Sequence, residues 1–516
     1  MDSSNLGGIF QDAQLNPAKF YANAFKLHKI QVKQNKIKST GPVRGSRKQA
    51  RPRKISQIIG GECQNWKRGQ LGKNLLDSFA LIFAQTGPEG VVATILEQSS
   101  AESNIYTLWV ARNFVRDCRF SNLAEEIGKW FKASELHVKG HHIHIPSPNN
   151  DLWTKILQNC YPIICIHLTN AYNIKENENV ELDDTQKWIK SLVASKSYQD
   201  KRRWKEVLDA LPPILDQLNG YFSQKFDPNN KGSAEECEDG KSAPTEFLDK
   251  ITSLCYQLLE SHKELTTEFF KDCCKTGTQD KWLKVFRRLI FVMASYRRAW
   301  YDMVRFKTDH ESATLQIRCL PNSTYCEGNS IMLTEIFEAG VKMGIYERDD
   351  EREFKREYPA LERLEKATKF PGRFGKASPR VHCEMRILDY VLENRDPTKF
   401  FNYIGCSKGP CWLCYHTLKF MAPGIGMRAP HWKLYPVWEP PRFLNSPPNR
   451  ERFIDVLQIL DDRIENLRRL AETRKRRPWE HRFSGCGTDC PGIEDAFLSP
   501  RTESMCQLEE AEKNNG

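Results

Sequence analysis

Apolar side chains recur at helical spacing over most of the chain. Between residues 71 and 97, for example, Leu75, Leu76 and Phe79 are followed by Ile82 and Phe83, which is the spacing of one buried helix face. The same criterion predicts helices over residues 17–27, 104–115, 122–131, 150–218, 245–271, 282–306, 386–394 and 452–470. The region before residue 312 is therefore expected to be mainly α-helical.

Three shorter segments have the character of strands. Residues 314–320 alternate, with Leu315, Ile317 and Cys319 on one side. Residues 400–405 are rich in aromatic and β-branched side chains, and residues 431–438 combine aromatic and apolar residues. These strands lie among predicted helices, so the C-terminal part of the chain is predicted to be an α/β domain.

Charge is unevenly distributed along the 516 residues, although the net charge of +11 is modest for that length. Residues 13–61 contain no acidic side chain, and the stretch from Arg44 to Lys54 is basic and rich in Gly, Ser and Pro. Such an arm often contacts nucleic acid or serves as a nuclear import signal, and its alternative interpretation is a solvated tail.

Cysteine usage and the absence of targeting signals point to a location inside the cell. The 17 cysteines are odd in number and irregularly spaced, which favours reduced thiols over a disulfide framework. The chain opens without a signal-peptide pattern, and no apolar run reaches membrane-spanning length. We expect an intracellular protein, in the nucleus or cytoplasm, with no membrane partner.

The candidate chemistry lies in two short motifs. His382 and Glu384 form a His-x-Glu pair, and Cys411 and Cys414 form a Pro-Cys-x-x-Cys motif that begins at Pro410. This order is the signature of zinc nucleobase deaminases. One imidazole and two thiolates give Zn²⁺ three ligands and leave the fourth tetrahedral position for a water, whose pKa the metal lowers towards neutrality. A carboxylate two residues after the histidine is suited to shuttle protons.

Local spacing brings these residues together. His382 and Glu384 fall in the first turn of the helix predicted for residues 386–394. A strand follows, and Pro410 then favours the start of a second helix. Cys411 and Cys414 are three residues apart, so both thiolates lie on one face near its N-terminus, where the helix dipole favours the thiolate form.

The run from His382 to Phe420 closely resembles the OTT-like deaminases, a branch of the cytidine deaminase-like superfamily found largely in fungal proteins. The resemblance implies a cytidine deaminase-like αβα sandwich, bound zinc, and a nucleobase within a nucleotide or nucleic acid as substrate. It carries over His382, Cys411 and Cys414 as zinc ligands and Glu384 as the catalytic proton shuttle. Cys383 departs from the family, which has a small residue between the histidine and the glutamate. The β-hairpin that usually precedes the histidine helix is not identifiable in the sequence.

Composition and periodicity together divide the chain into seven segments. The break at 227–244 is the clearest, because it lacks apolar periodicity and contains two glycines and a charge block. The expected segments are a basic, disordered arm at 1–60, a helical domain of unknown role at 61–226, a linker at 227–244, long helices at 245–311, the zinc-dependent deaminase-like domain at 312–445, an amphipathic helix at 446–478 and a disordered tail at 479–516.

Two alternatives from other functional classes stay open. If Cys406, His416 or His431 supplied a fourth ligand, the zinc site would be closed and structural, and the protein would be an inert nucleic-acid-binding or scaffold module. Alternatively, the helical region could form homo-oligomers that control the deaminase. Near the C-terminus, Phe453 and Leu457 begin a short heptad seam, which favours packing on the preceding domain or a short coiled coil.

Overall fold

A computed structural model of the protein describes most of the chain between residues 5 and 473. The described residues are 5–40, 68–85, 90–98, 104–113, 118–133, 151–177, 180, 182, 185, 187, 198–225, 244–276, 280–310, 312–320, 331–351, 354, 376–377, 381–394, 397–435, 438–441, 443 and 446–473. The predicted linker except residue 244, the basic run from Arg44 to Lys54 and the C-terminal tail therefore lie outside the described residues.

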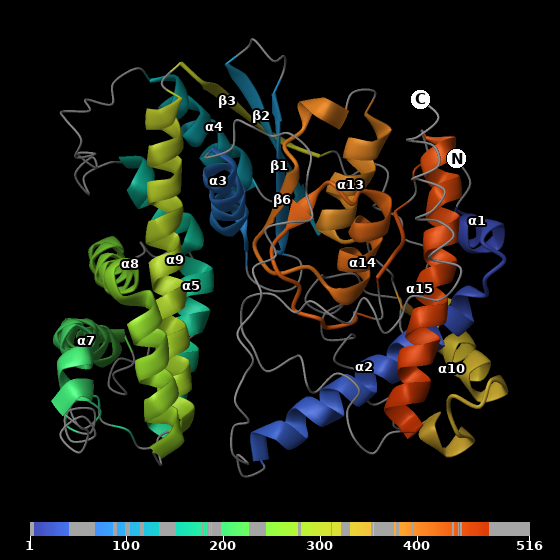
Figure 1. Ribbon diagram of the computed structural model, residues 1–516, viewed down its shortest axis with the longest axis horizontal. Coiled ribbons are helices and arrows are strands. Elements are labelled where there is room, and N and C mark those ends of the chain that lie inside the picture. Colours follow the sequence, from blue (N-terminus) through green and yellow to red (C-terminus); the bar gives the residue numbers. More distant parts are fainter. Residues whose placement is uncertain are drawn as a thin grey trace.

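A mixed five-stranded sheet with the order β3-β2-β1-β6-β7 lies at the centre of the fold (Figure 1). Strands β1 and β2 form an antiparallel hairpin, β3 is parallel to β2, β6 is antiparallel to β1, and β7 is parallel to β6. Their bounds are β1 Val92–Gln98, β2 Ile105–Arg112, β3 Thr314–Cys319, β6 Tyr403–Cys406 and β7 Gly426–Met427. A separate short pair joins β4 Ile331–Met332 to β5 Lys376–Ala377.

The hairpin corrects the prediction of a helix over residues 104–115, because that segment contains β2. A short apolar run cannot be assigned to helix or strand by periodicity alone, and here burial of both sheet faces removed the usual alternation. The same hairpin is the one that the sequence did not reveal ahead of the histidine helix. It also shows that the sheet takes strands from both sides of residue 312, so residues 312–445 do not contain the whole α/β unit.

Helices cover one face of the sheet in a thick layer, which lies at the left of Figure 1. They are α3 Arg68–Phe83, α4 Cys118–Lys132, α5 Asp151–Asn177, α7 Tyr198–Lys225, α8 Thr245–Thr276 and α9 Asp280–Asp309. Except over 104–115, the helices predicted between residues 71 and 306 agree with these elements where the structure describes them. Val92 and Leu96 of β1 point into this layer, and the hydroxyl of Thr94 donates a hydrogen bond to the carbonyl of Leu76 in α3 (2.9 Å).

Helices from both ends of the chain lie on the other side of the sheet (Figure 1), and one of them, α13 (Cys383–Glu393), packs directly on β1, β2 and β6. These helices are α1 Asn5–Asp12, α2 Pro17–Thr40, α10 Leu333–Lys342, α13 Cys383–Glu393, α14 Trp412–Met421 and α15 Pro447–Thr473, with the 3₁₀ turns Arg348–Asp350 and Pro397–Lys399 nearby. Ala93 and Ile95 of β1 contribute to this second core, opposite Val92 and Leu96. The sheet is therefore a middle layer between helices, which fits an α/β deaminase fold.

The N-terminal segment is a second correction. The helix predicted for residues 17–27 is confirmed, but α2 continues to Thr40, and residues 5–40 are not a disordered arm. Phe20, Tyr21 and Phe25 are buried between α10 and α15, which explains why a segment rich in lysine still folds. The many basic residues drew attention away from the apolar face of α2. This helix is stabilised by the packing of that face against α10 and α15.

The C-terminal helix is confirmed, and its seam faces inward. Phe453, Leu457, Leu460 and Ile464 are buried where α15 meets α2 and α14. Of the two roles considered for this heptad seam, the structure supports packing within the chain. In addition, none of the described helices is long and apolar enough to cross a bilayer.

The strand predicted for residues 431–438 is wrong, since β7 pairs with β6 instead. Backbone groups of this segment bind elsewhere: His431 donates to the carbonyl of Pro410, and the Lys433 carbonyl accepts from Trp412. The N–H of Leu434 donates to the Gln31 side chain. Trp432 has a positive φ of 59°, a conformation that extended strands do not contain.

Candidate metal centre

Three side chains that could hold a metal ion meet between the starts of α13 and α14. His382 Nδ1 lies 3.5 Å from Cys411 Sγ and 3.3 Å from Cys414 Sγ, and the two sulfur atoms are 3.4 Å apart. The cysteines are buried, and so is most of the His382 side chain. The three predicted ligands are thus brought together by elements that are separate in the sequence.

The spacing of these atoms fits zinc. With Zn–S of about 2.3 Å and Zn–N of about 2.0 Å, tetrahedral geometry separates two sulfur ligands by about 3.8 Å and a sulfur from a nitrogen by about 3.5 Å. The observed separations of 3.3 to 3.5 Å are within a few tenths of an ångström of those values. One imidazole with two thiolates is also a typical donor set for zinc.

The cluster contains three protein ligands and no fourth among the described residues. Cys406 is buried, and its thiol donates to the Ile404 carbonyl. His416 instead packs against Trp412 and lies 3.4 Å from an Arg463 nitrogen. His431 accepts a hydrogen bond from the backbone N–H of Lys433. None of these three residues completes a closed site, so the candidate centre has three ligands from the part of the chain that the structure describes.

Buried hydrogen bonds set the start of α13. His382 is the N-cap residue, with extended backbone angles, so its side chain projects from the helix end. The Cys383 N–H donates to the Asn113 side chain just after β2 (2.8 Å). The buried guanidinium of Arg386 donates to the carbonyls of Arg112 and Leu320, at the ends of β2 and β3. The hairpin that the sequence hid therefore positions the histidine.

The second motif is held from the opposite face of the sheet. Asp77 of α3 accepts hydrogen bonds from the Cys406 N–H and the Tyr403 hydroxyl, both at 2.9 Å. Arg428 donates to the Cys406 carbonyl (3.0 Å). A side chain at Gly405 would collide with the backbone of Leu76, since its Cβ would lie 2.3 Å from the carbonyl carbon. Strand β6 therefore packs directly on α3, and the chain continues from β6 into the turn that carries the cysteines.

The N-terminus of α14 also favours a thiolate. Cys411 is the N-cap residue, and its sulfur accepts a hydrogen bond from the Cys414 N–H (3.4 Å). Burial opposes ionisation of Cys411, but hydrogen bonding by Cys414 and the charge of His382 together hold the pKa of this thiol well below its usual range. The prediction that both cysteines share one face at a helix start is confirmed.

Glu384 lies in the first turn of α13 and is 3% exposed. Burial raises the pKa of its carboxyl, and the charge of His382 opposes that shift. The Cys383 thiol donates to the Glu384 carboxylate (3.5 Å). The residue that departs from the family pattern therefore contacts the predicted proton shuttle and does not join the metal cluster.

Several residues of the site were not predicted. Asn113, Asp77 and Arg386 anchor the ligand-bearing segments, and Tyr435 lies against a ligand, with its ring centroid 5.8 Å from that of His382. Sequence spacing carries no signal for such contacts, because each joins segments from different parts of the chain. Trp412, the first residue of α14, is buried and packs on His416.

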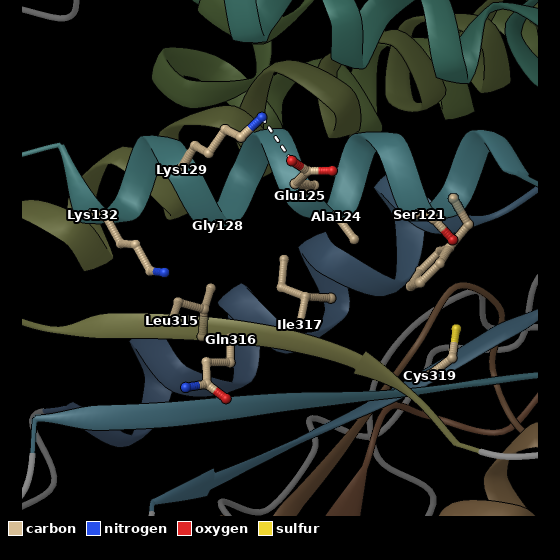
Figure 2. A pocket seen from close by; sticks show the side chains of 11 residues that line it. Ser121, Ala124, Glu125, Gly128, Lys129, Lys132, Leu315, Gln316, Ile317 and Cys319 are labelled. Carbon is tan, nitrogen blue, oxygen red and sulfur yellow. Dashed lines mark ion pairs between the residues drawn. The ribbon is translucent and has the colours of Figure 1, made fainter.

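A cavity of about 530 Å³ lies elsewhere, between α4 and the edge strand β3 (Figure 2). Leu315, Ile317 and Cys319 point from the strand towards the helix, and Lys132 reaches in from the helix end. No metal-centre residue lines this cavity. Its size suits a small molecule, but it has no connection to the candidate chemistry.

A sheet between helical layers, with a histidine, a glutamate and two cysteines at two helix starts, is compatible with an α/β deaminase fold. Comparison with known families agrees: residues 381–442 match the OTT-like deaminase family. The resemblance seen in the sequence is thus confirmed over that segment. No curated protein and no solved structure matches the chain.

Proposed function

We propose that the protein is a zinc-dependent hydrolytic deaminase that acts on a nucleobase, cytosine or adenine, within nucleic acid or a nucleotide. The observation that carries the proposal is the three-ligand cluster of His382, Cys411 and Cys414 with Glu384 buried beside it. Its match to the OTT-like deaminases supports the same reaction class.

The reaction replaces an exocyclic amino group with oxygen. Zinc, when bound by His382, Cys411 and Cys414, would supply the Lewis acidity that makes water a nucleophile near neutral pH. Glu384 would accept one proton from that water and deliver it to the ring nitrogen, and would then accept the second proton from the added hydroxyl and pass it to the departing amine. Water adds at C4 of cytosine or C6 of adenine, the C–N bond breaks, and ammonia leaves. No redox partner is needed.

The open coordination position favours catalysis over a structural zinc. A structural site is closed by four protein ligands, whereas a catalytic site has three and keeps one position for water or substrate. Cys406, His416 and His431 are each engaged outside the cluster. Among the residues that the structure describes, the inert scaffold alternative therefore lacks the fourth ligand that it requires.

Three cations near the site support a substrate that carries phosphate. Lys408 precedes the Pro-Cys-x-x-Cys turn, and Lys433 contributes its carbonyl to the start of α14. Partial burial lowers the pKa of Lys408, and the nearby charges of Arg288 and Lys433 lower it further. All three residues still present surface to solvent, and among the described residues none has an acidic partner. Phosphate is the complementary ligand.

The arginine side chains of α9 do not share one surface that could bind phosphate. Arg297 is buried and donates to Asp249 (2.7 Å), while Arg298 lies 3.5 Å from a Glu260 oxygen. Only Arg288 is positioned beside Lys408. The proposal of a nucleic-acid or nucleotide substrate therefore rests on the cations around the metal centre.

The direct test measures zinc content and ammonia release together, for the wild type and for Glu384→Gln. Pools of single-stranded DNA, single-stranded RNA, nucleotides and free nucleosides serve as substrates. We expect about one zinc per chain in both proteins, because Glu384 is not a ligand. Ammonia should be released by the wild type and reduced at least about a hundredfold in the variant.

Each outcome decides something. Ammonia from nucleotides or nucleic acid but not from nucleosides would support the phosphate requirement, and Lys408→Ala with Lys433→Ala should then weaken substrate binding. Zinc without ammonia from any pool would contradict the proposed activity on these substrates. Absence of zinc would overturn the metal-centre assignment.

A further inference from the structure

The segment His431–Tyr435, called here the 431–435 loop, borders the metal centre. The ring of Tyr435 lies edge-to-face with the His382 imidazole, with centroids 5.8 Å apart and planes at 69°. It also contacts the His431 ring at 5.4 Å. Tyr435 is nevertheless 37% exposed, which is high for a large side chain beside a buried cluster. An aromatic surface is thus accessible at the edge of the candidate site.

Tyr435 combines contact with the candidate ligand His382 and access from solvent, because its ring lies against the imidazole and is still partly exposed. A planar base bound at the open coordination position would therefore meet this side chain, and aromatic side chains bind bases by stacking.

Two backbone hydrogen bonds attach the 431–435 loop to the cysteine motif. The His431 N–H donates to the Pro410 carbonyl (3.2 Å), and the Lys433 carbonyl accepts from the Trp412 N–H (3.1 Å). At Gly409, a Cβ atom would lie 2.4 Å from the Ala429 carbonyl oxygen, so the two segments pack at backbone contact distance.

Helix α2 holds the other side of the same loop. His28 Nδ1 donates to the Leu434 carbonyl (2.8 Å), and the Gln31 side-chain oxygen accepts from the Leu434 N–H (3.3 Å). Both backbone polar groups of one residue are thus bound by side chains one helical turn apart. Tyr21 donates to the Trp438 carbonyl (3.1 Å), which adds a third contact beyond the loop. The Leu434 side chain is fully buried.

We propose that α2 is a positioning element of the catalytic site, which fixes the 431–435 loop through Leu434 so that Tyr435 contacts the substrate base. This inference rests on the proposed function for its substrate. It gives the N-terminal segment a role at the metal centre, where periodicity and charge had suggested a disordered arm.

The first test asks whether α2 orders the loop, and it needs no substrate. His28→Leu combined with Gln31→Met removes both polar partners of Leu434 and keeps similar side-chain volume. Hydrogen exchange followed by mass spectrometry should show amides of residues 431–435 exchanging about tenfold faster, while β6 is unchanged. His28→Asn, which keeps a donor near Nδ1, should restore most of the protection relative to His28→Leu.

Lys19→Ala is the matched control, because Lys19 lies on the same helix and pairs with Glu465 of α15 at 3.2 Å. It should leave exchange in the 431–435 loop unchanged. Equal exchange in wild type and in the His28/Gln31 variant would overturn the positioning role of α2.

The second test concerns catalysis and uses whichever pool releases ammonia with the wild type. Tyr435→Leu and the His28/Gln31 variant should each keep about one zinc per chain and raise KM about tenfold, with kcat changed much less. Tyr435→Trp should retain most of the wild-type KM. Combining Tyr435→Leu with the helix variant should add little, since both changes remove the same contact.

An unchanged KM in Tyr435→Leu would overturn the substrate contact, while activity of the wild type would leave the proposed function standing. Conversely, the wild type could release no ammonia while the His28/Gln31 variant shows faster hydrogen exchange. That result would support the positioning of the loop by α2 and contradict only the proposed function. The two failures are therefore distinguishable.

Discussion

The two faces of the central sheet handle buried charge in opposite ways. Under α9, Arg297 and the indole of Trp153 both donate to Asp249 at 2.7 Å, and Lys307 donates to the carbonyl of Ala133, also at 2.7 Å. These groups satisfy one another within the protein. Under α13, Cys411, Cys414 and His382 converge on one point, and Glu384 is buried beside it.

The difference indicates which face performs chemistry. Burying ionisable groups is costly unless partners compensate for the lost water, so satisfied pairs such as Arg297 with Asp249 are typical of architecture. Two thiols and an imidazole directed at one point instead form a donor set that a metal ion would hold together. The helical layer is therefore interpreted as a support, which reaches the site through Asp77 and Arg288.

The largest effect should come from removing a ligand. Cys414→Ser is expected to lower zinc content from about one per chain to almost none and to abolish ammonia release, because the thiolate is one of three ligands. Mass spectrometry of the metal measures the first quantity. Cys406→Ala is the matched control, since Cys406 is buried nearby but outside the cluster. Equal loss of zinc in both variants would contradict the ligand assignment.

A smaller effect, confined to stability, is expected on the α9 side. Asp249→Ala leaves the buried Arg297 and the Trp153 indole without their acceptor and should cost about 2 kcal/mol of unfolding free energy. Zinc content and KM should stay at wild-type values. Urea denaturation measures the loss, and Arg298→Ala, at a more exposed pair, should change stability by less than about 0.5 kcal/mol. A loss of zinc in Asp249→Ala would break the distinction between the two faces.

The smallest effect is a pH dependence on the same side. Burial raises the pKa of Asp302 to about 6, although Ser78 donates to it. A carboxyl with a raised pKa binds its proton more tightly in the folded state, so its contribution to stability is present at low pH and falls as pH rises from about 4 to about 6.

Asp302→Asn removes this titration and keeps an acceptor for Ser78. The variant should gain about 1 kcal/mol relative to the wild type at pH 7 and lose that advantage at pH 4. Thermal unfolding of both proteins at several pH values measures the difference in stability between the variant and the wild type. The other carboxyls contribute equally to both proteins, so their contributions cancel in this difference. A difference independent of pH would show that Asp302 is not the titrating group.

Part of the fold could be read from periodicity. The helices that contain Phe79, Trp153 and Leu457 were predicted because each buries one continuous stripe, which spacing reveals directly. The hairpin from Val92 to Arg112 was missed, because a strand buried on both faces loses its alternation. The 431–435 loop was predicted to be a strand because it is rich in aromatic residues. Aromatic content does not reveal which groups the backbone of a segment will bind, and here they are not those of a neighbouring strand.

The sequence by itself identified His382, Cys411 and Cys414 as candidate ligands and Glu384 as the candidate proton shuttle, and it revealed the resemblance to the OTT-like deaminases that the match over residues 381–442 confirms. These depend on spacings of two or three residues at a helix start, which local geometry controls. The tertiary structure decided that the described residues bring three candidate ligands and no fourth to one point, that the hairpin positions His382 through Asn113, and that α2 holds the 431–435 loop. Those features join residues up to about four hundred positions apart. Such contacts form because they bury apolar groups together and satisfy hydrogen bonds across the fold, and the spacing of residues within one segment does not reveal them.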